Sequence, residues 1–274
     1  MNQVTIDQIN LINKDFYSKI SSQWNQKLDS KWMGWNRLIT HIKNNFENKD
    51  IIRILDLGCG NGRFATFLNA NLKQKIEYTG VDFDTFFLQQ AKDRDEYTTQ
   101  NTYNTKKFNK FDLIDLDLTK DNLTKIFINK GHNQKYDLVV LFGLIHHIAS
   151  KNSRLQLLNL AKSCLDDQNT NGLLVWTSWR FLDQPRLLKR VVDLDSPLGQ
   201  QIIKDNNLDI KQLEIGDHFL SWVKHDYAIR FSHYINEQEG KNLINSTNLK
   251  LLDYYVDDSI TQNLNGYYIC GRTV

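Results

Sequence analysis

Residues 54–62 read ILDLGCGNG, an apolar run that ends abruptly in a loop with three glycines. The run begins at Ile51, and after the loop apolar residues recur at helical spacing, at Phe64, Phe67, Leu68 and Leu72. Glycines between a buried strand and a helix allow a tight turn, and the amide groups at the start of the helix can bind a ligand there. The stretch therefore predicts a strand, a ligand-binding turn and a helix.

The same alternation continues along the chain. Apolar runs typical of buried parallel strands occur between helical patterns, at 76–81, 111–118, 136–142 and 173–177, with the helices at 85–93, 121–130 and 152–165. Near the end, a helix at 237–246 precedes two strand-like runs, 249–256 and 266–274, that have no helix between them. We expect an α/β, Rossmann-like fold: a seven-stranded, mostly parallel sheet with an antiparallel C-terminal hairpin.

Two regions add to this pattern. Residues 1–50 contain two amphipathic helical patterns, the first opening with a capping box at 5–8, and we expect them to form an N-terminal helical extension of the domain at 51–274. Residues 178–236 are longer than an ordinary connection between a strand and a helix. We expect this segment to be an insertion that binds substrate or forms a lid.

The composition argues against several classes of protein, including membrane-spanning and disulfide-rich proteins. The 274 residues are 41% hydrophobic and 24% charged, with a formal net charge of +2, so nucleic-acid binding would need a local basic patch. No run of about 18 apolar residues occurs, and the first residues lack a signal-peptide pattern, so we expect a cytoplasmic protein without membrane spans. Cys59, Cys164 and Cys270 are scattered, which argues against a disulfide framework and a cysteine-rich metal site.

The glycine loop is compatible with two classes of cofactor. A dinucleotide site needs G-x-G-x-x-G, but here the third glycine, Gly62, comes one position early and the bulky Arg63 follows it. Asp56 also lies two positions before the first glycine. The string instead resembles motif I of the class I S-adenosylmethionine-dependent methyltransferases, and this resemblance implies the class I methyltransferase fold for residues 51–274.

The resemblance also implies which residues hold S-adenosylmethionine. The loop residues Asp56, Gly58, Cys59 and Gly60 would surround the methionine part of the cofactor. A carboxylate suits a vicinal diol because it accepts two hydrogen bonds, so Asp82, followed by Phe83, would bind the ribose. The remaining contacts would be Asp117 and Leu118 at the adenine and Phe142 beneath the cofactor, with Asp115 as the alternative to Asp117.

Paired histidines, His146 and His147, follow the fourth predicted strand, where open α/β sheets bind ligands. They suggest general-base chemistry or a metal, but no third ligand lies at a metal-like spacing, and we expect no metal site. The pair is common in this superfamily, including in members that need no base. A packing or loop-orienting role is therefore the default expectation.

Outside the cofactor half, four segments resemble the tRNA wobble-uridine carboxymethyl methyltransferase family. They are residues 17–35, 175–179, 216–222 and 230–234. The resemblance implies esterification of a carboxymethyl group on an anticodon base, and eukaryotic members of that family require an activating partner subunit. Two rival functions stay open: methylation of a small carboxylate, hydroxyl or amine metabolite, and a non-catalytic cofactor-binding module.

Ester formation sets its own chemical demands. A carboxyl group with a pKa near ~4 is already ionised at neutral pH, so it needs charge-assisted positioning rather than a base. Arg230 offers a bidentate fork and His233 a second donor, and we predict that they form a catalytic clamp. The aromatic residues Trp179, Trp222 and Tyr234 are the predicted substrate contacts.

Two basic clusters are candidates for tRNA binding. The stronger consists of Arg180, Arg186, Lys189 and Arg190, and the weaker of Lys106, Lys107 and Lys110.

Overall fold

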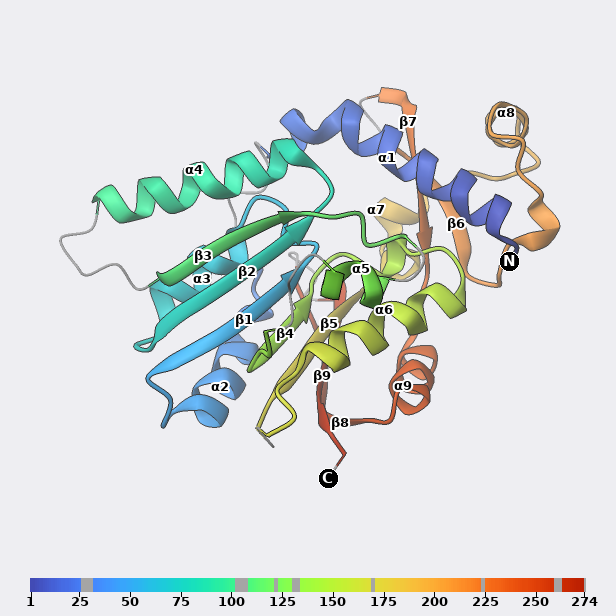
Figure 1. Cartoon of the computed structure of the whole chain (residues 1–274). Coiled ribbons are helices and arrows are strands. Elements are labelled where there is room, and N and C mark those ends of the chain that lie inside the picture. Colours follow the sequence, from blue (N-terminus) through green and yellow to red (C-terminus); the bar gives the residue numbers. More distant parts are fainter. Residues whose placement is uncertain are drawn as a thin grey trace.

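A seven-stranded sheet forms the centre of the chain (Figure 1). The computed structural model describes residues 1–25, 32–101, 108–120, 123–129, 134–168, 171–222, 225–258 and 263–273. The strands lie in the order β3-β2-β1-β4-β5-β9-β8. Their bounds are β1 Ile51–Leu57, β2 Lys75–Asp82, β3 Phe108–Asp115, β4 Leu138–Leu141, β5 Leu173–Trp179, β8 Leu249–Asp257 and β9 Asn265–Arg272. Strands β1 to β5 pair in parallel, and β9 lies antiparallel between β5 and β8. The predicted sheet and its C-terminal hairpin are confirmed.

Helices cover both faces of the sheet. Alternate residues of each strand point to opposite faces and so belong to two separate cores. Leu55 and Leu57 belong to the core that α5 (Leu123–Asn129), α6 (Lys151–Cys164) and α9 (Glu237–Ser246) complete. Ile52 and Ile54 belong to the opposite core, which is completed by two more helices, α2 (Trp35–Phe46) and α3 (Arg63–Asn71). The helix α4 (Thr85–Asn101) packs beside β2 and β3. This burial on both faces explains the near-continuous apolar runs of the parallel strands.

The N-terminal helix and the insertion pack against each other. Helix α1 (Gln3–Asn25) lies along a separate two-stranded antiparallel sheet of β6 (Asp217–Trp222) and β7 (His225–His233) (Figure 1). Ile9 of α1 shares a core with Phe219 and Phe231 of these strands. The other helical elements before β6 are η1 (Ile145–His147), η2 (Phe181–Asp183), α7 (Pro185–Leu188), α8 (Pro197–Asp205) and η3 (Ile210–Gln212).

Several boundaries differ from the sequence-based expectation. Helix α1 begins at Gln3, because Asn2 Oδ1 accepts a hydrogen bond from the Thr5 amide at 2.9 Å, so Asn2 and not Thr5 caps it. Strand β3 ends at Asp115, three residues before the predicted end. The apolar run continues past it because Leu116 and Leu118 remain in the core after the hydrogen-bonded strand has ended.

No helix among the described residues is both long enough and apolar enough to cross a membrane.

Candidate active site

A cavity of about 970 Å³ lies at the carboxyl ends of the parallel strands. The loops after β1, β2, β3 and β4 line one side of it, and residues of α1, α7 and β7 line the other. Ligand pockets commonly measure about 300–1,000 Å³, so this one is large enough for a cofactor and part of an acceptor together. Open α/β sheets bind ligands at this edge.

The glycine loop forms the floor of one end. Gly58 and Gly60 have φ angles of 80° and 51°, a left-handed region that favours glycine. A Cβ added at Gly60 would meet no atom within 4 Å, so the backbone there borders open space in the cavity. The amides of Gly58 and Cys59 donate to the Val81 carbonyl at 2.8 and 3.0 Å, which fixes the loop against β2.

Two carboxylates flank this loop, the buried Asp56 and the half-buried Asp82. Asp82 accepts hydrogen bonds from the Gly60 amide at 2.9 Å and the Asp84 amide at 3.0 Å, and burial raises its pKa to about 6. Asp56 accepts from the Tyr78 hydroxyl at 2.6 Å through Oδ2, whereas its buried Oδ1 has no partner among the described residues. Burial raises the pKa of Asp56 to about 7. An orphaned buried acceptor beside a glycine loop fits a cationic donor of a ligand, such as the ammonium of S-adenosylmethionine.

The loop after β3 supplies the next wall. Asp117 and Leu118 line the cavity, whereas Asp115 is exposed and does not. Asp117 Oδ1 accepts from the Thr119 hydroxyl at 2.6 Å, and its Oδ2 lies 2.6 Å from Lys14 Nζ of α1. Burial would raise the pKa of Asp117, but these two contacts outweigh it and lower the pKa. Of the two aspartates considered from sequence, the structure brings Asp117 to the cavity.

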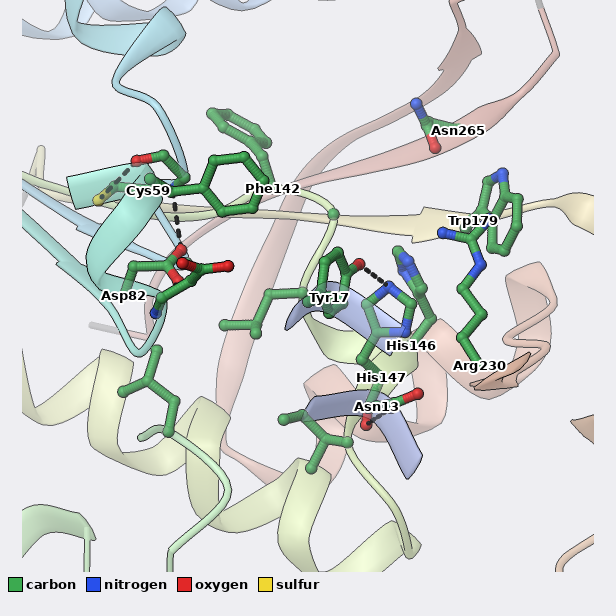
Figure 2. A pocket seen from close by; sticks show the side chains of 18 of the residues that line it. Asn13, Tyr17, Cys59, Asp82, Phe142, His146, His147, Trp179, Arg230 and Asn265 are labelled. Carbon is green, nitrogen blue, oxygen red and sulfur yellow. Dashed lines mark hydrogen bonds between the residues drawn. The ribbon is translucent and has the colours of Figure 1, made fainter. Parts of the chain in front are cut away.

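The other predicted cofactor residues also line the cavity. Cys59 is buried, and desolvation raises the pKa of its thiol well above the ordinary value, so the thiol stays protonated. Phe142 packs edge-on against Phe64, with ring centroids 4.8 Å apart, and Phe83 lies 6.3 Å from the Tyr17 ring. Figure 2 shows Cys59, Asp82 and Phe142 together at one end of the cavity.

The opposite end is built around Arg230 (Figure 2). Arg230 is only 6% exposed, and its Cζ lies 4.2 Å from the ring centroid of Trp179 and 5.2 Å from that of Phe16. Its guanidinium hydrogen-bonds the hydroxyl of Tyr17. Trp222 lines the same end, with Arg190 Cζ 5.8 Å from its ring centroid. Arg230, predicted as a catalytic clamp residue, is therefore brought together with two predicted substrate contacts, Trp179 and Trp222.

The paired histidines have different surroundings. His147 Nδ1 donates to the Phe231 carbonyl at 3.0 Å, so its Nε2 accepts from the Tyr17 hydroxyl at 2.9 Å. Burial, with a smaller contribution from the Arg230 charge, lowers the pKa of His147 to about 3. His147 thus orients the loop, as expected by default, whereas His146 Nδ1 has no hydrogen-bond partner among the described residues.

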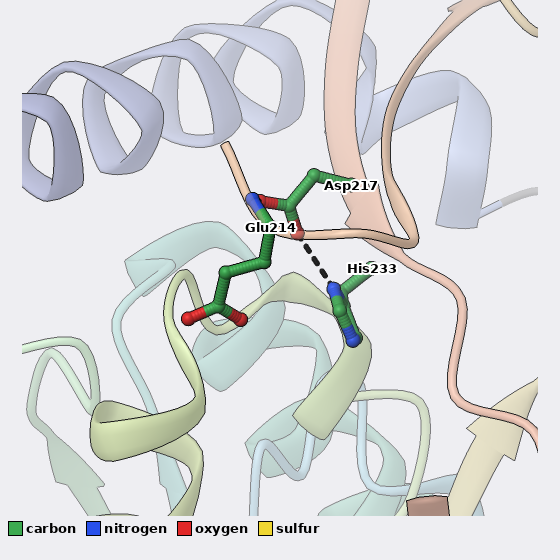
Figure 3. Close-up of side chains that lie close together, drawn as sticks. All are labelled: Glu214, Asp217 and His233. Carbon is green, nitrogen blue, oxygen red and sulfur yellow. Dashed lines mark hydrogen bonds and ion pairs between the residues drawn. The ribbon is translucent and has the colours of Figure 1, made fainter. Parts of the chain in front are cut away.

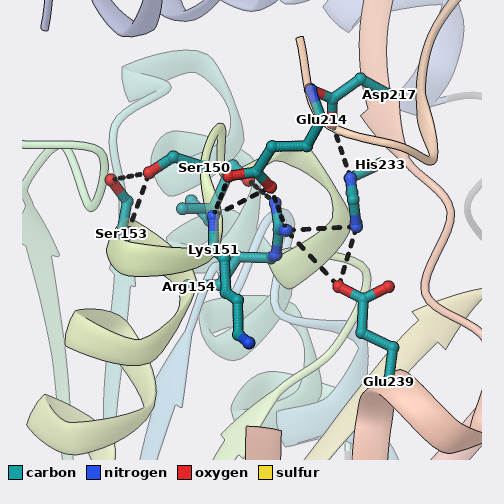
Figure 4. Close-up of polar contacts among 9 residues, drawn as sticks. Ser150, Lys151, Ser153, Arg154, Glu214, Asp217, His233 and Glu239 are labelled. Atoms are coloured by element: carbon teal, nitrogen blue, oxygen red, sulfur yellow. Dashed lines mark hydrogen bonds and ion pairs between the residues drawn. The ribbon is translucent and has the colours of Figure 1, made fainter. Parts of the chain in front are cut away.

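His233 does not line the cavity with Arg230, so the predicted pairing of these two residues in a clamp is wrong. Residues three apart on a strand point to opposite faces. Because the side chain of Arg230 points into the cavity, that of His233 points away from it. His233 Nδ1 lies 2.6 Å from Asp217 and its Nε2 2.9 Å from Glu239 (Figure 4). Tyr234 likewise does not line the cavity, and its hydroxyl donates to Asp183 at 2.8 Å.

The cluster around His233 has metal-ligating side chains but also a cation. Glu214, Asp217 and His233 each place one potential ligand atom within 4.8 Å of the others (Figure 3). Arg154, 1% exposed, lies 2.7 Å from Glu214 and 3.1 Å from His233 Nε2 (Figure 4). Because the guanidinium already supplies the positive charge, this cluster is a structural ion-pair network that joins α6, β6, β7 and α9.

The predicted basic patch divides into two parts. Arg186 and Arg190 line the cavity, and Lys189 beside them is exposed. Arg180 instead lies 2.7 Å from Asp183 and donates to the Tyr254 hydroxyl at 3.1 Å. In the weaker cluster, Lys110 pairs with Asp112 at 2.6 Å. Lys106 and Lys107 lie outside the described residues.

Sequence reasoning missed the contribution of α1. Asn10, Asn13, Lys14 and Tyr17 recur at helical spacing and all line the cavity. Asn13 binds both neighbouring elements, donating to the His147 carbonyl at 3.2 Å and accepting from the Phe231 amide at 2.8 Å. The sequence signal that could have identified these residues is the polar stripe at positions i, i+3, i+4 and i+7 of the helix.

Known proteins resemble this chain in part of its sequence and in its fold. Residues 55–170 match the family described as methyltransferase domain. No curated protein sequence matches the chain. Among solved structures, a protein described as a SAM-dependent methyltransferase from Methanosarcina mazei is similar at 15% identity and a TM-score of 0.58, covering 85% of this chain and 97% of its own.

Two further structures of methyltransferases are similar over nearly the whole chain. The N-methyltransferase NodS from Bradyrhizobium japonicum, in complex with S-adenosyl-L-homocysteine, shares 11% identity at a TM-score of 0.53, covering 96% of this chain and 99% of its own. The 1,6-didemethyltoxoflavin N1-methyltransferase from Burkholderia thailandensis shares 10% identity at a TM-score of 0.57, covering 97% and 88%. The strand order and these solved structures show that the chain has the class I methyltransferase fold, and residues 55–170 of it match a methyltransferase domain.

Proposed function

We propose that this protein uses S-adenosylmethionine to methylate a carboxylate, and that the acceptor is the carboxymethyl group of a modified wobble uridine in tRNA. The observation that carries the proposal is the buried guanidinium of Arg230 between Trp179 and Phe16 at the far end of the cavity. Arginine matches a planar carboxylate with two parallel hydrogen bonds, and aromatic faces can stack a base.

The residues of the glycine-loop end would hold the cofactor. S-adenosylmethionine supplies an electrophilic methyl group on a positively charged sulfur. Asp82 would accept from the ribose hydroxyls, Asp56 Oδ1 would accept from the ammonium group, and Asp117 would lie beside the adenine. The backbone at Gly60 leaves space for close approach, whereas a Cβ at Gly58 would lie 3.2 Å from Leu144 Cβ.

The state of the histidines favours an acceptor that is already ionised. Burial, then the neighbouring His147 and Arg230 charges, lower the pKa of His146 well below its ordinary value, and His147 is shifted to about 3. Such weakly basic groups are poor general bases at neutral pH. A carboxylate needs no base, whereas a hydroxyl or ammonium acceptor must lose a proton.

Charge is distributed unevenly along the cavity wall. Asp56, Asp82 and Asp117 lie at the cofactor end, together with the cations Lys14, which pairs with Asp117, and Arg63. Arg186, Arg190 and Arg230 lie at the acceptor end. Asp258 also lines the cavity, but its carboxylate accepts hydrogen bonds from the Gly34 amide, Asn265 and Tyr267. The acceptor end therefore favours an anion, and Arg186 and Arg190 at its border suit the phosphates that accompany a nucleotide base.

A small carboxylate metabolite is the second candidate. The formal net charge of +2 favours it, because a protein that binds tRNA usually presents a broader basic surface. Both candidates use the same carboxylate chemistry at Arg230, so they differ only in what lies beyond the carboxymethyl group.

Product analysis separates the candidates. The purified protein is incubated with methyl-labelled S-adenosylmethionine and tRNA carrying 5-carboxymethyluridine at the wobble position, and the nucleosides are then analysed. We expect label in the methyl ester of that nucleoside, none in matched tRNA with an unmodified uridine, and a turnover number that is flat between about pH 6 and 8. Label only in free small carboxylates would favour the second candidate, and turnover that rises with slope one through that window would favour a hydroxyl or amine acceptor.

A further inference from the structure

The acceptor end contains a buried polar side chain, His146, that forms no hydrogen bond with the described part of the protein. His146 is 4% exposed and lines the cavity, yet its Nδ1 has no hydrogen-bond partner among the described residues. Buried polar atoms are nearly always hydrogen-bonded, and each exception calls for an explanation. The neighbouring His147 does not share this property, because Phe231 and Tyr17 satisfy both of its nitrogens.

His146 lies where the acceptor group would lie. Its ring centroid is 5.6 Å from that of Trp179, the same ring that Arg230 Cζ approaches to 4.2 Å. Figure 2 shows His146, Trp179 and Arg230 gathered at the end of the cavity away from Asp82. The imidazole and the guanidinium therefore border the same part of the cavity.

The protonation state of His146 decides what it can offer. Its pKa is lowered, so the ring is neutral at pH 7 and carries a proton on one nitrogen only. Neither ring nitrogen of His146 hydrogen-bonds another residue in the described part of the chain, and of the two only Nδ1 is fully buried, so a proton on Nε2 is the one that a ligand in the cavity could accept. A neutral ring with one N–H can donate a single hydrogen bond to an anionic oxygen.

We propose that His146 is the second donor of the acceptor clamp, the role that the sequence had suggested for His233. Arg230 would supply the charge and the fork, and His146 would donate one hydrogen bond to a carboxylate oxygen of the acceptor. The inference rests on the proposed carboxylate methylation. It makes His146 a specificity-determining residue, because a neutral ester or amide in place of the carboxylate would be a poorer acceptor of this hydrogen bond.

The test compares two substitutions of His146 with one of His147. His146→Phe keeps a ring but removes the donor, and His146→Gln restores an N–H near the position of Nε2. With tRNA carrying 5-carboxymethyluridine and saturating S-adenosylmethionine, we expect His146→Phe to raise the KM for tRNA at least about tenfold and His146→Gln to recover most of that loss. Cofactor affinity, measured by calorimetry, should stay unchanged in both.

Thermal unfolding provides the structural control. His146→Phe removes no hydrogen bond within the described part of the protein, so its Tm should equal or exceed that of the wild type. His147→Phe breaks the contacts with Tyr17 and Phe231 and should lower the Tm. A wild-type KM in a folded His146→Phe variant would overturn the clamp alone. Wild-type protein that methylates no carboxylate would overturn the proposed function and the clamp with it.

Discussion

Replacing Arg230 by lysine separates charge from geometry at the acceptor end. Lysine keeps a positive charge but is a single point of contact, whereas the arginine fork can bind two carboxylate oxygens and the Tyr17 hydroxyl at the same time. The guanidinium also lies 4.2 Å from the centroid of the Trp179 ring, a planar contact that an ammonium group reproduces less well.

The magnitude follows from the contacts that are lost. One charge-assisted hydrogen bond is worth about 1.5–3 kcal/mol, so its loss predicts a fall in kcat/KM of at least about tenfold for Arg230→Lys. Cofactor affinity should not change, because Cys59 and Asp82 lie at the other end of the cavity (Figure 2). Single-turnover methyl transfer and calorimetric titration with the cofactor, on the same preparation, measure both quantities.

Arg37 offers a matched control. It forms a fork on Asp253, with distances of 3.0 and 2.7 Å, and does not line the cavity. Arg37→Lys therefore removes a carboxylate fork of the same kind and should leave methyl transfer unchanged. Wild-type turnover in Arg230→Lys would refute the clamp, and joint loss of turnover and cofactor binding would show that Arg230 is structural.

Three other predictions follow from the same geometry. Asp82→Asn should weaken S-adenosylmethionine binding by about 1.5–3 kcal/mol, and unchanged affinity in calorimetry would remove Asp82 from the site. Burial alone would lower the pKa of His233, but its hydrogen bonds to Asp217 and Glu239 raise it, so this contribution to stability is complete below the unfolded pKa and is lost as pH rises through the folded pKa. Asp217→Asn should therefore cost about 3–5 kcal/mol in urea unfolding at pH 6 and less at pH 9, and equal losses at both would contradict the assignment. If tRNA phosphates contact the cavity border, replacing Arg186 or Arg190 by alanine should each reduce the log–log salt slope of tRNA affinity by about 0.7–0.9, whereas a salt-independent affinity would favour the small acceptor.

The residues predicted from sequence to hold the cofactor all line one cavity, and their determinants are local. The glycine loop, Asp82 and the apolar strands are each recognisable within about ten residues, and parallel strands bring their carboxyl ends to one edge regardless of distant contacts. The choice between Asp115 and Asp117 needed the structure, because it depends on where β3 stops.

The acceptor end was harder to predict because its residues come from distant elements. Tyr17 of α1 hydrogen-bonds His147, 130 residues away, and no local pattern contains that pairing. Arg230 and His233 appeared to be one unit because they are close in sequence. Only their position on a strand, where side chains alternate between faces, shows that they act on opposite sides.

The charges along the cavity favour binding of the proposed substrate over binding of its product. Asp56 and Asp82 at one end and Arg230 at the other would hold groups of opposite sign, and the apolar rings of Phe142 and Trp179 limit the water that would screen them. Ester formation removes the negative charge from the acceptor. The hold of Arg230 then weakens, since a neutral ester oxygen accepts a weaker hydrogen bond than a carboxylate. In the proposed reaction, the residue that selects the substrate would therefore also favour release of the product.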